Sequence, residues 1–168
     1  MAGIKSIDDL FLHTLKDIYY AERQILKALP KMAKAAQSDE LREGFLLHRD
    51  QTQGQVERLQ QVFEALGKRA QGVTCEAING LIEECEELLD EAPTPSAVRD
   101  AGLVACAQAV EHYEMARYGA LIAWAKVSGK KDILALLEAN LQEEKETDTL
   151  LNKMANGTIN PQALKQAA

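Results

Sequence analysis

The stretch AVEHYEMARYGAL, residues 109–121, decides the fold of this chain and raises the main question about its function. It lies in a run rich in Ala, Val, Leu, Ile and Trp, which is typical of a helix packed inside a protein. Glu111 and Glu114 are three residues apart within it and therefore share one face of that helix. An isolated buried carboxylate is costly, so the two glutamates need partners from elsewhere in the chain.

The composition indicates a single all-α domain. The 168 residues suffice for one core, and the good helix formers Ala, Leu, Glu, Lys and Gln dominate. The net charge of −7 argues against nucleic acid as a partner, because no basic stripe could neutralise a phosphate backbone. No apolar run has the length of a membrane span, and neither a signal peptide nor a CxxC pair is present. We therefore expect a cytoplasmic protein with free cysteines.

Helix signals divide the chain into four long helices and one short one. Serine N-caps and glycine stops predict long helices at about 7–37, 39–66, 97–128 and 131–155, an amphipathic helix at 76–91, and a loosely docked tail at 157–168. Pro30 is expected to kink or interrupt the end of the first helix. Two tight hairpins joined by a long crossover predict a ferritin-like four-helix bundle.

Polar residues interrupt the apolar stripe of every long helix near its midpoint. In an antiparallel bundle of similar-length helices, the midpoints lie in one layer. The interruptions therefore place five carboxylates and an imidazole in one slab of the core, from Glu22, His48, Glu111, Glu114, Glu144 and Asp148.

Protons, cationic side chains or a metal ion could neutralise such a slab. Carboxylates with a nearby imidazole are the ligand set of iron and manganese, and di-iron bundles combine Glu residues with Glu-x-x-His pairs in this way. Cationic residues close in sequence offer a metal-free alternative, with buried ion pairs to Arg23, Arg58, Arg117 or Lys145. His112 falls one position off the stripe and is expected to point outward or to support a ligand.

Five stretches of the chain resemble the YciE/YciF-type ferritin-like proteins, a bacterial stress-associated family. They are DIYYAERQILKALPKMAKAA (17–36), HRDQTQGQVERLQQVFEALG (48–67), AINGLIEE (77–84), AQAVEHYEMARYGAL (107–121) and EEKETD (143–148). The resemblance implies a homodimer with a di-metal site, whose ligands would be Glu22, position 51, Glu111 or Glu114, Glu144 and Asp148. Many relatives have His-x-Glu-Glu-Thr in the second helix, whereas this chain has Gln51 at the second glutamate. That replacement weakens the case for two metal ions.

Two hypotheses about function follow. The first is a ferritin-like metal-binding protein that holds iron, as one ion or two, or manganese, and takes part in redox chemistry of a stress response with a small oxidant. Its ligands would be Glu22, Glu111, Glu114, Glu144 and Asp148, with His48 and Gln51 as weaker candidates. The second is a metal-free structural or interaction protein of the same fold with a degenerate site. The sequence leaves open whether the protein is an enzyme.

Overall fold

The computed structural model describes residues 3–92 and 94–166, and all regular structure in that part of the chain is helical. Four long helices form the bundle, namely α1 (Ile7–Ala35), α2 (Asp39–Ala65), α4 (Ala97–Val127) and α5 (Leu134–Met154). The smaller elements are α3 (Glu76–Glu91), the 3-10 turn η1 (Lys131–Ile133), the π-turn η2 (Ala155–Ile159) and α6 (Asn160–Gln166). No helix among the described residues is long and apolar enough to cross a membrane. The predicted all-helical bundle is confirmed.

Three serines fix where the bundle helices begin. Ser6, Ser38 and Ser96 are the N-caps of α1, α2 and α4. The side chain of each serine accepts a hydrogen bond from the backbone N–H three residues further on. A cap of this kind contributes about 1 kcal/mol to stability. The caps therefore fix the start of three helices that carry residues of the predicted polar slab.

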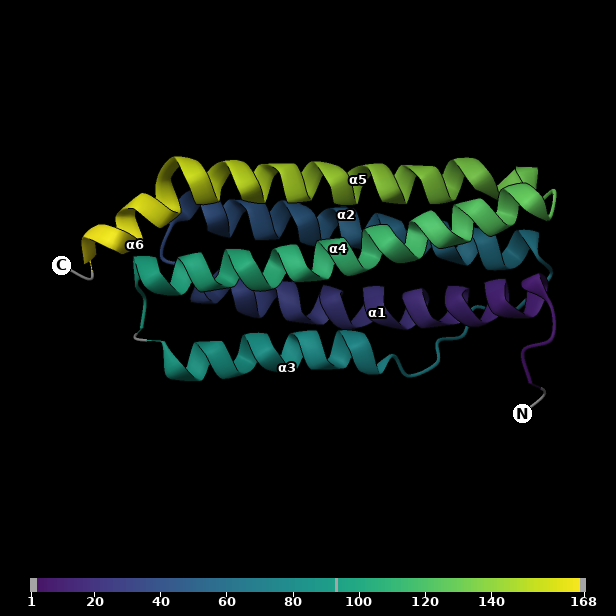
Figure 1. Ribbon diagram of the computed structural model, residues 1–168, viewed down its shortest axis with the longest axis horizontal. Coiled ribbons are helices and arrows are strands. Elements are labelled where there is room, and N and C mark those ends of the chain that lie inside the picture. The colour runs from purple at the N-terminus through teal and green to yellow at the C-terminus, as the bar shows by residue number, and fades with distance from the viewer. Residues whose placement is uncertain (1–2, 93, 167–168) are drawn as a thin grey trace.

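The helices pair as two antiparallel hairpins, α1 with α2 and α4 with α5 (Figure 1). Between the hairpins, α3 returns the chain to the end at which α2 began, so that α2 and α4 run in the same direction. Each hairpin helix packs on both helices beside it, α1 on α2 and α4, and α5 on α2 and α4. Consequently α1 lies diagonally opposite α5, and α2 lies diagonally opposite α4. This connectivity is the ferritin-like one.

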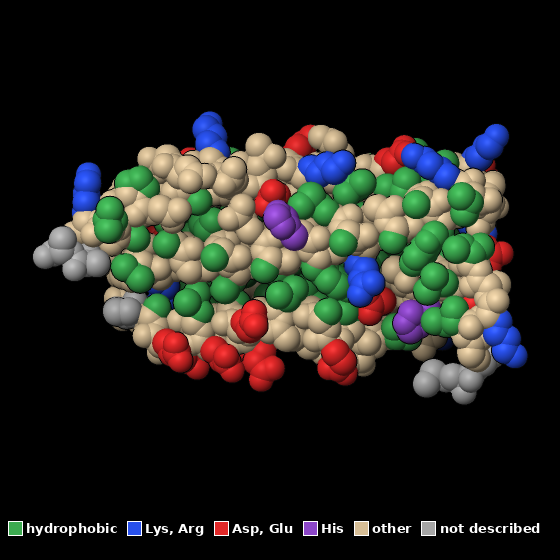
Figure 2. Space-filling view, in the orientation of Figure 1, with side chains coloured by type: hydrophobic (Ala, Val, Ile, Leu, Met, Phe, Trp, Pro, Cys, Tyr) green, Lys and Arg blue, Asp and Glu red, His purple; other side chains and the backbone are tan. Residues whose placement is uncertain are grey.

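The crossover helix α3 covers α1 and α4 with its inner face and exposes acidic residues on the other. Ile78 and Cys85 are buried, whereas the acidic residues line the outer edge of the molecule in Figure 2 (Glu83, Glu84, Glu86, Glu87, Asp90 and Glu91). The approach to α4 is close at Gly102, where a Cβ atom would lie 2.5 Å from Leu88 Cδ2. Only glycine permits this packing without displacing Leu88.

A polar group at the start of α3, the anchor cluster, ties this helix to α1 and α4. It comprises Asp17, Cys75, Tyr113 and Arg117. Tyr113 donates a hydrogen bond to Asp17 Oδ2 at 2.6 Å, and its hydroxyl lies 2.9 Å from Cys75 Sγ. Arg117 Nε lies 3.7 Å from the same Asp17 oxygen, and its guanidinium lies over the Tyr113 ring, 5.1 Å from the centroid. The polar groups of this cluster therefore find their partners inside the chain.

The prediction of a helix stop at Gly157 followed by a loosely docked tail is wrong. Gly157 does not take a positive φ angle, unlike Gly67 and Gly129, and the chain continues through the π-turn into α6. Ile159 is buried, and Gln166 Oε1 accepts a hydrogen bond of 2.8 Å from the backbone N–H of Ala97. Because Pro161 lacks an N–H and its ring would clash with the carbonyl four residues earlier, the wider π-turn lets the helix continue. Residues 167–168 lie outside the described part of the chain.

Pro30 does not interrupt α1. The helix continues through this residue to Ala35, two residues short of the predicted end at 37. Pro30 is exposed, so its ring faces solvent. Its position removes one backbone hydrogen bond from the helix without breaking it.

Candidate metal centre

The structure buries five ionisable residues of the predicted slab at the middle of the bundle, and we call these five residues the central layer. They are Glu22 of α1, His48 of α2, Glu111 and Glu114 of α4, and Glu144 of α5, none more than 3% exposed. On α1 the glutamate lies between the buried residues Ile18 and Ile25. The helical repeat that builds the apolar core therefore also carries these polar side chains into it.

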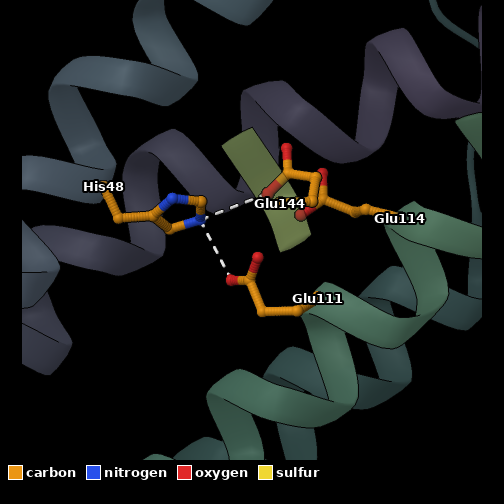
Figure 3. A group of neighbouring side chains, drawn as sticks. All are labelled: His48, Glu111, Glu114 and Glu144. Atoms are coloured by element: carbon orange, nitrogen blue, oxygen red, sulfur yellow. Dashed lines mark ion pairs between the residues drawn. The ribbon is translucent and has the colours of Figure 1, made fainter. Parts of the chain in front are cut away.

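Four of the five side chains converge on one point (Figure 3). His48 Nε2 lies 3.1 Å from Glu111 Oε1 and 3.9 Å from Glu144 Oε2. One ligand atom from each of His48, Glu111, Glu114 and Glu144 lies within 4.8 Å of the other three. This spread is close to the ~4 Å that separates ligands on opposite sides of an ion held at about 2 Å. Three carboxylates and one imidazole suit iron or manganese.

Most of the converging atoms have no hydrogen-bond partner among the described residues. Both carboxylate oxygens of Glu114 and of Glu144 are buried without one, as are His48 Nε2 and one oxygen each of Glu22 and Glu111. The short contact between His48 and Glu111 is not aligned as a hydrogen bond. A buried polar group without a partner costs about 1–3 kcal/mol, and more when it is charged. The donor set therefore fits a cation, which could bind one atom from each of His48, Glu111, Glu114 and Glu144 at once.

Burial raises the pKa of every carboxyl in the central layer. The pKa of Glu111 rises to about 8, mainly through burial and then through repulsion by neighbouring carboxylates. The pKa values of Glu22, Glu114 and Glu144 lie well above the ordinary range, again because of burial first and carboxylate repulsion second. Protonation relieves both the burial of charge and the repulsion, so the layer holds protons in the metal-free protein and a metal ion would displace them on binding.

The cationic residues that could have neutralised the layer make other contacts. Arg58 pairs with Glu143, and Arg117 pairs with Asp17. Arg23 and Lys145 are exposed, and the guanidinium of Arg23 lies over the Tyr19 ring. Among the described residues, no Lys or Arg forms an ion pair with a glutamate of the central layer. This arrangement does not support the ion-pair explanation of the buried acids.

A chain of hydrogen bonds leads from the central layer toward solvent. Tyr118 donates to Glu22 Oε1 and accepts a hydrogen bond of 2.9 Å from Asn140 Nδ2. Arg58 donates to Asn140 Oδ1 and to the half-buried Glu143. Tyr118 is fully buried, so its hydroxyl holds one oxygen of Glu22 in place while the other oxygen stays free. Asn140 was not predicted as part of the site.

Helix α2 contributes three polar residues at this level. His48 Nδ1 lies 3.3 Å from Thr147 Oγ1, which directs the other ring nitrogen into the layer. Thr52 is satisfied by donating to the carbonyl of His48 at 2.8 Å. Gln55 is fully buried, and neither its amide oxygen nor its amide nitrogen has a hydrogen-bond partner among the described residues. Its place on the buried stripe of α2 follows from the three- and four-residue steps that lead from His48 through Thr52.

Asp148 and Gln51 are not brought into the converging group. The Asp148 carboxylate accepts a hydrogen bond of 3.2 Å from Gln108 and lies 3.2 Å from Nε2 of His112. The side chain of His112 is 65% exposed, so it points outward as expected. Gln51 is half-buried, whereas Thr52 beside it is fully buried. The stripe of α2 thus passes through positions 48, 52 and 55, and position 51 lies at its edge.

An apolar cavity leads to the central layer between α1, α3 and α4. It encloses about 50 Å³ and is bounded by His48 and Glu111 on one side and by Lys31 and Glu86 on another. Lys31 and Glu86 are exposed and form an ion pair of 3.0 Å. Since a water molecule needs roughly 10–15 Å³ measured in this way, the cavity has room for a molecule the size of dioxygen or hydrogen peroxide.

A family model described as a domain of unknown function, DUF892, matches residues 6–164. The chain belongs to the DUF892 family. It is 41% identical to Protein YciF of Escherichia coli K12 over 166 residues. This alignment covers 98% of this chain and 99% of the relative. The resemblance to YciF-type proteins is therefore confirmed.

Solved structures of two relatives share the fold over most of their length. The crystal structure of the E. coli stress protein YciF superposes with a TM-score of 0.88 at 42% identity, covering 94% of this chain and 99% of that one. YcfI from Rhodopseudomonas palustris, provisionally described as a structural protein, superposes with a TM-score of 0.87 at 54% identity, covering 89% and 94%.

Proposed function

We propose that this protein binds a single iron or manganese ion in the central layer, with His48, Glu111, Glu114 and Glu144 as its ligands. The observation that carries the proposal is the set of buried, converging carboxylate and imidazole atoms that have no hydrogen-bond partner. Three carboxylates would neutralise a divalent ion, and the Thr147 contact orients His48 toward it. A bound ion of this kind would supply redox chemistry and an open coordination position to a small oxidant.

Glu22 borders this ligand group and does not complete a second one. One of its oxygens accepts the hydrogen bond from Tyr118, and the buried side chain on α2 that has no hydrogen-bond partner among the described residues, besides His48, is the neutral amide of Gln55. A second ion would therefore have fewer charged ligands than the first. We expect one ion per chain at the concentration that saturates the first site.

The proposal is tested by adding metal to chelator-treated protein. Anaerobic Fe(II) or Mn(II) at about a hundred times its Kd is expected to raise the free energy of unfolding by about 2.7 kcal/mol, because only the folded state binds it. His48→Ala and Glu144→Gln should abolish the effect, whereas Glu146→Gln, an exposed change on the same helix, should not. Titration calorimetry gives the stoichiometry. An unchanged melting temperature with both metals, together with no anomalous scattering at the layer, would contradict the proposal.

The provisional description of YcfI favours a second candidate, a metal-free structural protein. In that case the carboxyls of the layer share protons, and freshly purified protein contains no iron or manganese. Added metal would then change the free energy of unfolding of neither the wild type nor the Glu144→Gln variant. Metal analysis of protein purified without chelators separates the two candidates most directly.

A further inference from the structure

Two cysteines, Cys85 and Cys106, line one cavity where α3 packs on α4. The close contact of Leu88 with Gly102 brings the two helices together. Because the helices are antiparallel, one turn back along α3 and one turn forward along α4 lead from this contact to Cys85 and Cys106. The two side chains are free thiols that line one cavity, and each shifts the pKa of the other. The third cysteine, Cys75, belongs to the anchor cluster.

The thiol pair forms part of the wall of the apolar cavity. The same cavity is bounded by His48 and Glu111, so the thiols and the central layer border one space. Cys85 is buried, at 6% exposure, and Cys106 is half-buried. A small oxidant that enters the cavity therefore meets both sulfur atoms.

We propose that Cys85 and Cys106 are a peroxide-reactive dithiol that closes to a disulfide between α3 and α4. The Cys106 thiolate attacks one oxygen of hydrogen peroxide, the O–O bond breaks, and a sulfenic acid forms on Cys106 while the departing hydroxide takes up a proton to become water. The Cys85 thiol then attacks the sulfenic sulfur, the S–S bond forms, and a second water leaves. In sum, two thiols lose two electrons and two protons, and the peroxide becomes two waters. This reaction uses no metal and does not depend on the proposed metal site.

The interaction between the thiols decides which sulfur reacts first. The interaction with Cys85 lowers the pKa of Cys106, whereas the same interaction and burial raise the pKa of Cys85. Cys106 is also the more exposed of the two. Since the thiolate is the reactive form, Cys106 is the attacking residue and Cys85 is the resolving residue.

The test uses reduced, chelator-treated protein and equimolar hydrogen peroxide. Intact mass spectrometry should show a loss of two hydrogens, and a non-reducing peptide map should show one intrachain link between Cys85 and Cys106. Cys75→Ser is the matched control and should give the same product. Cys106→Ser should slow the oxidation by about tenfold or more, because the reactive thiolate is gone. Cys85→Ser should accumulate a sulfenic acid on Cys106 that dimedone traps.

Three results would overturn the proposal. They are oxidation of Cys75 ahead of the pair, a disulfide found only between chains, and no loss of thiols under conditions that oxidise free cysteine. The wild-type peptide map decides among these outcomes even if a variant fails to fold. A reduced and an oxidised sample with the same circular dichroism spectrum would show that the disulfide forms within the native bundle.

Discussion

The central layer and the anchor cluster both join α1 to α4 with polar side chains, and they satisfy those side chains in opposite ways. In the anchor cluster, Asp17 accepts a hydrogen bond from Tyr113 and pairs with Arg117. In the central layer, Glu114 has no hydrogen-bond partner for either oxygen among the described residues. A buried charge is tolerated either by donors built into the chain or by something bound from outside. The contrast is the one expected if the anchor cluster is structural and the central layer binds an ion, as we propose.

The largest expected difference between the two regions is in their response to pH. In the metal-free folded protein the pKa of Glu111 is about 8, against an ordinary value of 4.5, and those of Glu22, Glu114 and Glu144 are also raised. At pH values between 4.5 and about 8, the folded state keeps protons that the unfolded state has released. The free energy of unfolding therefore falls as the pH rises through this range. Each unit of pKa difference corresponds to ~1.4 kcal/mol, which predicts a loss of a few kcal/mol.

Urea unfolding of chelator-treated protein at pH 5.5 and pH 8.5 measures this loss. The double variant Glu111→Gln/Glu144→Gln should show a flatter dependence, because two of the responsible carboxyls are removed. A wild-type protein whose stability stays constant or rises over this range would show that the carboxyls of the layer are not held protonated.

Removing the acid of the anchor cluster is the next largest effect. Asp17→Asn is expected to lower the free energy of unfolding by about 2 kcal/mol, because hydrogen bonds to a charged group contribute about 1.5–3 kcal/mol. The response to metal should stay as in the wild type. Asp90→Asn, on the exposed face of α3, is the control and should change stability by no more than about 0.5 kcal/mol. Equal effects of the two substitutions would remove the distinction between the regions.

The corresponding change in the central layer should have the opposite sign. Glu114→Gln is expected to raise the stability of metal-free protein at pH 8 by about 1 kcal/mol, because glutamine is neutral without the proton that Glu114 must hold in the folded state at this pH. The same variant should bind Mn(II) more weakly. Glu146→Gln should alter neither property. A destabilised Glu114→Gln variant would indicate that this glutamate has a structural partner of its own.

The smallest effect is expected at His112, which lies outside the central layer. His112 is 65% exposed on its side chain and lies 3.2 Å from Asp148 Oδ1. His112→Ala should cost less than about 1 kcal/mol, as is usual for an exposed ion pair, and should leave metal binding unchanged. His48→Ala should abolish metal binding. Calorimetry measures the Mn(II) affinity of the two variants. Equal losses of affinity would indicate that the metal binds nearer the surface, close to His112.

The helix repeat was enough to predict most of the central layer. Steps of three and four residues from the apolar neighbours of Glu22, Glu111 and Glu144 place each glutamate on the buried face of its helix. On α5 the repeat is ambiguous, because a period of 3.6 allows a step of either three or four residues. The prediction continued from Glu144 to Asp148, whereas the structure buries Thr147. Asn140 is likewise buried, whereas Leu141 beside it is half-buried.

Gln51 shows the limit of reasoning from relatives. Its role was inferred from the resemblance, yet the buried face of α2 passes through His48, Thr52 and Gln55.

The prediction for the C-terminal segment was wrong for a different reason. Gly157 is a helix stop only if the chain adopts a positive φ there, and Pro161 changed how the following turn had to form. Such a choice depends on contacts with α4 that the local sequence does not contain.

The π-turn has a consequence for how the chain tolerates insertions and deletions. Each residue advances a helix by about 100°. Removing one residue between Ala155 and Ile159 would rotate α6 by roughly a quarter turn and carry Gln166 away from the first N–H of α4, which it now holds at 2.8 Å. The number of residues in this segment therefore matters more than their identity. Helix α6 therefore helps to hold the start of α4 in position, and α4 supplies two of the four candidate ligands, Glu111 and Glu114.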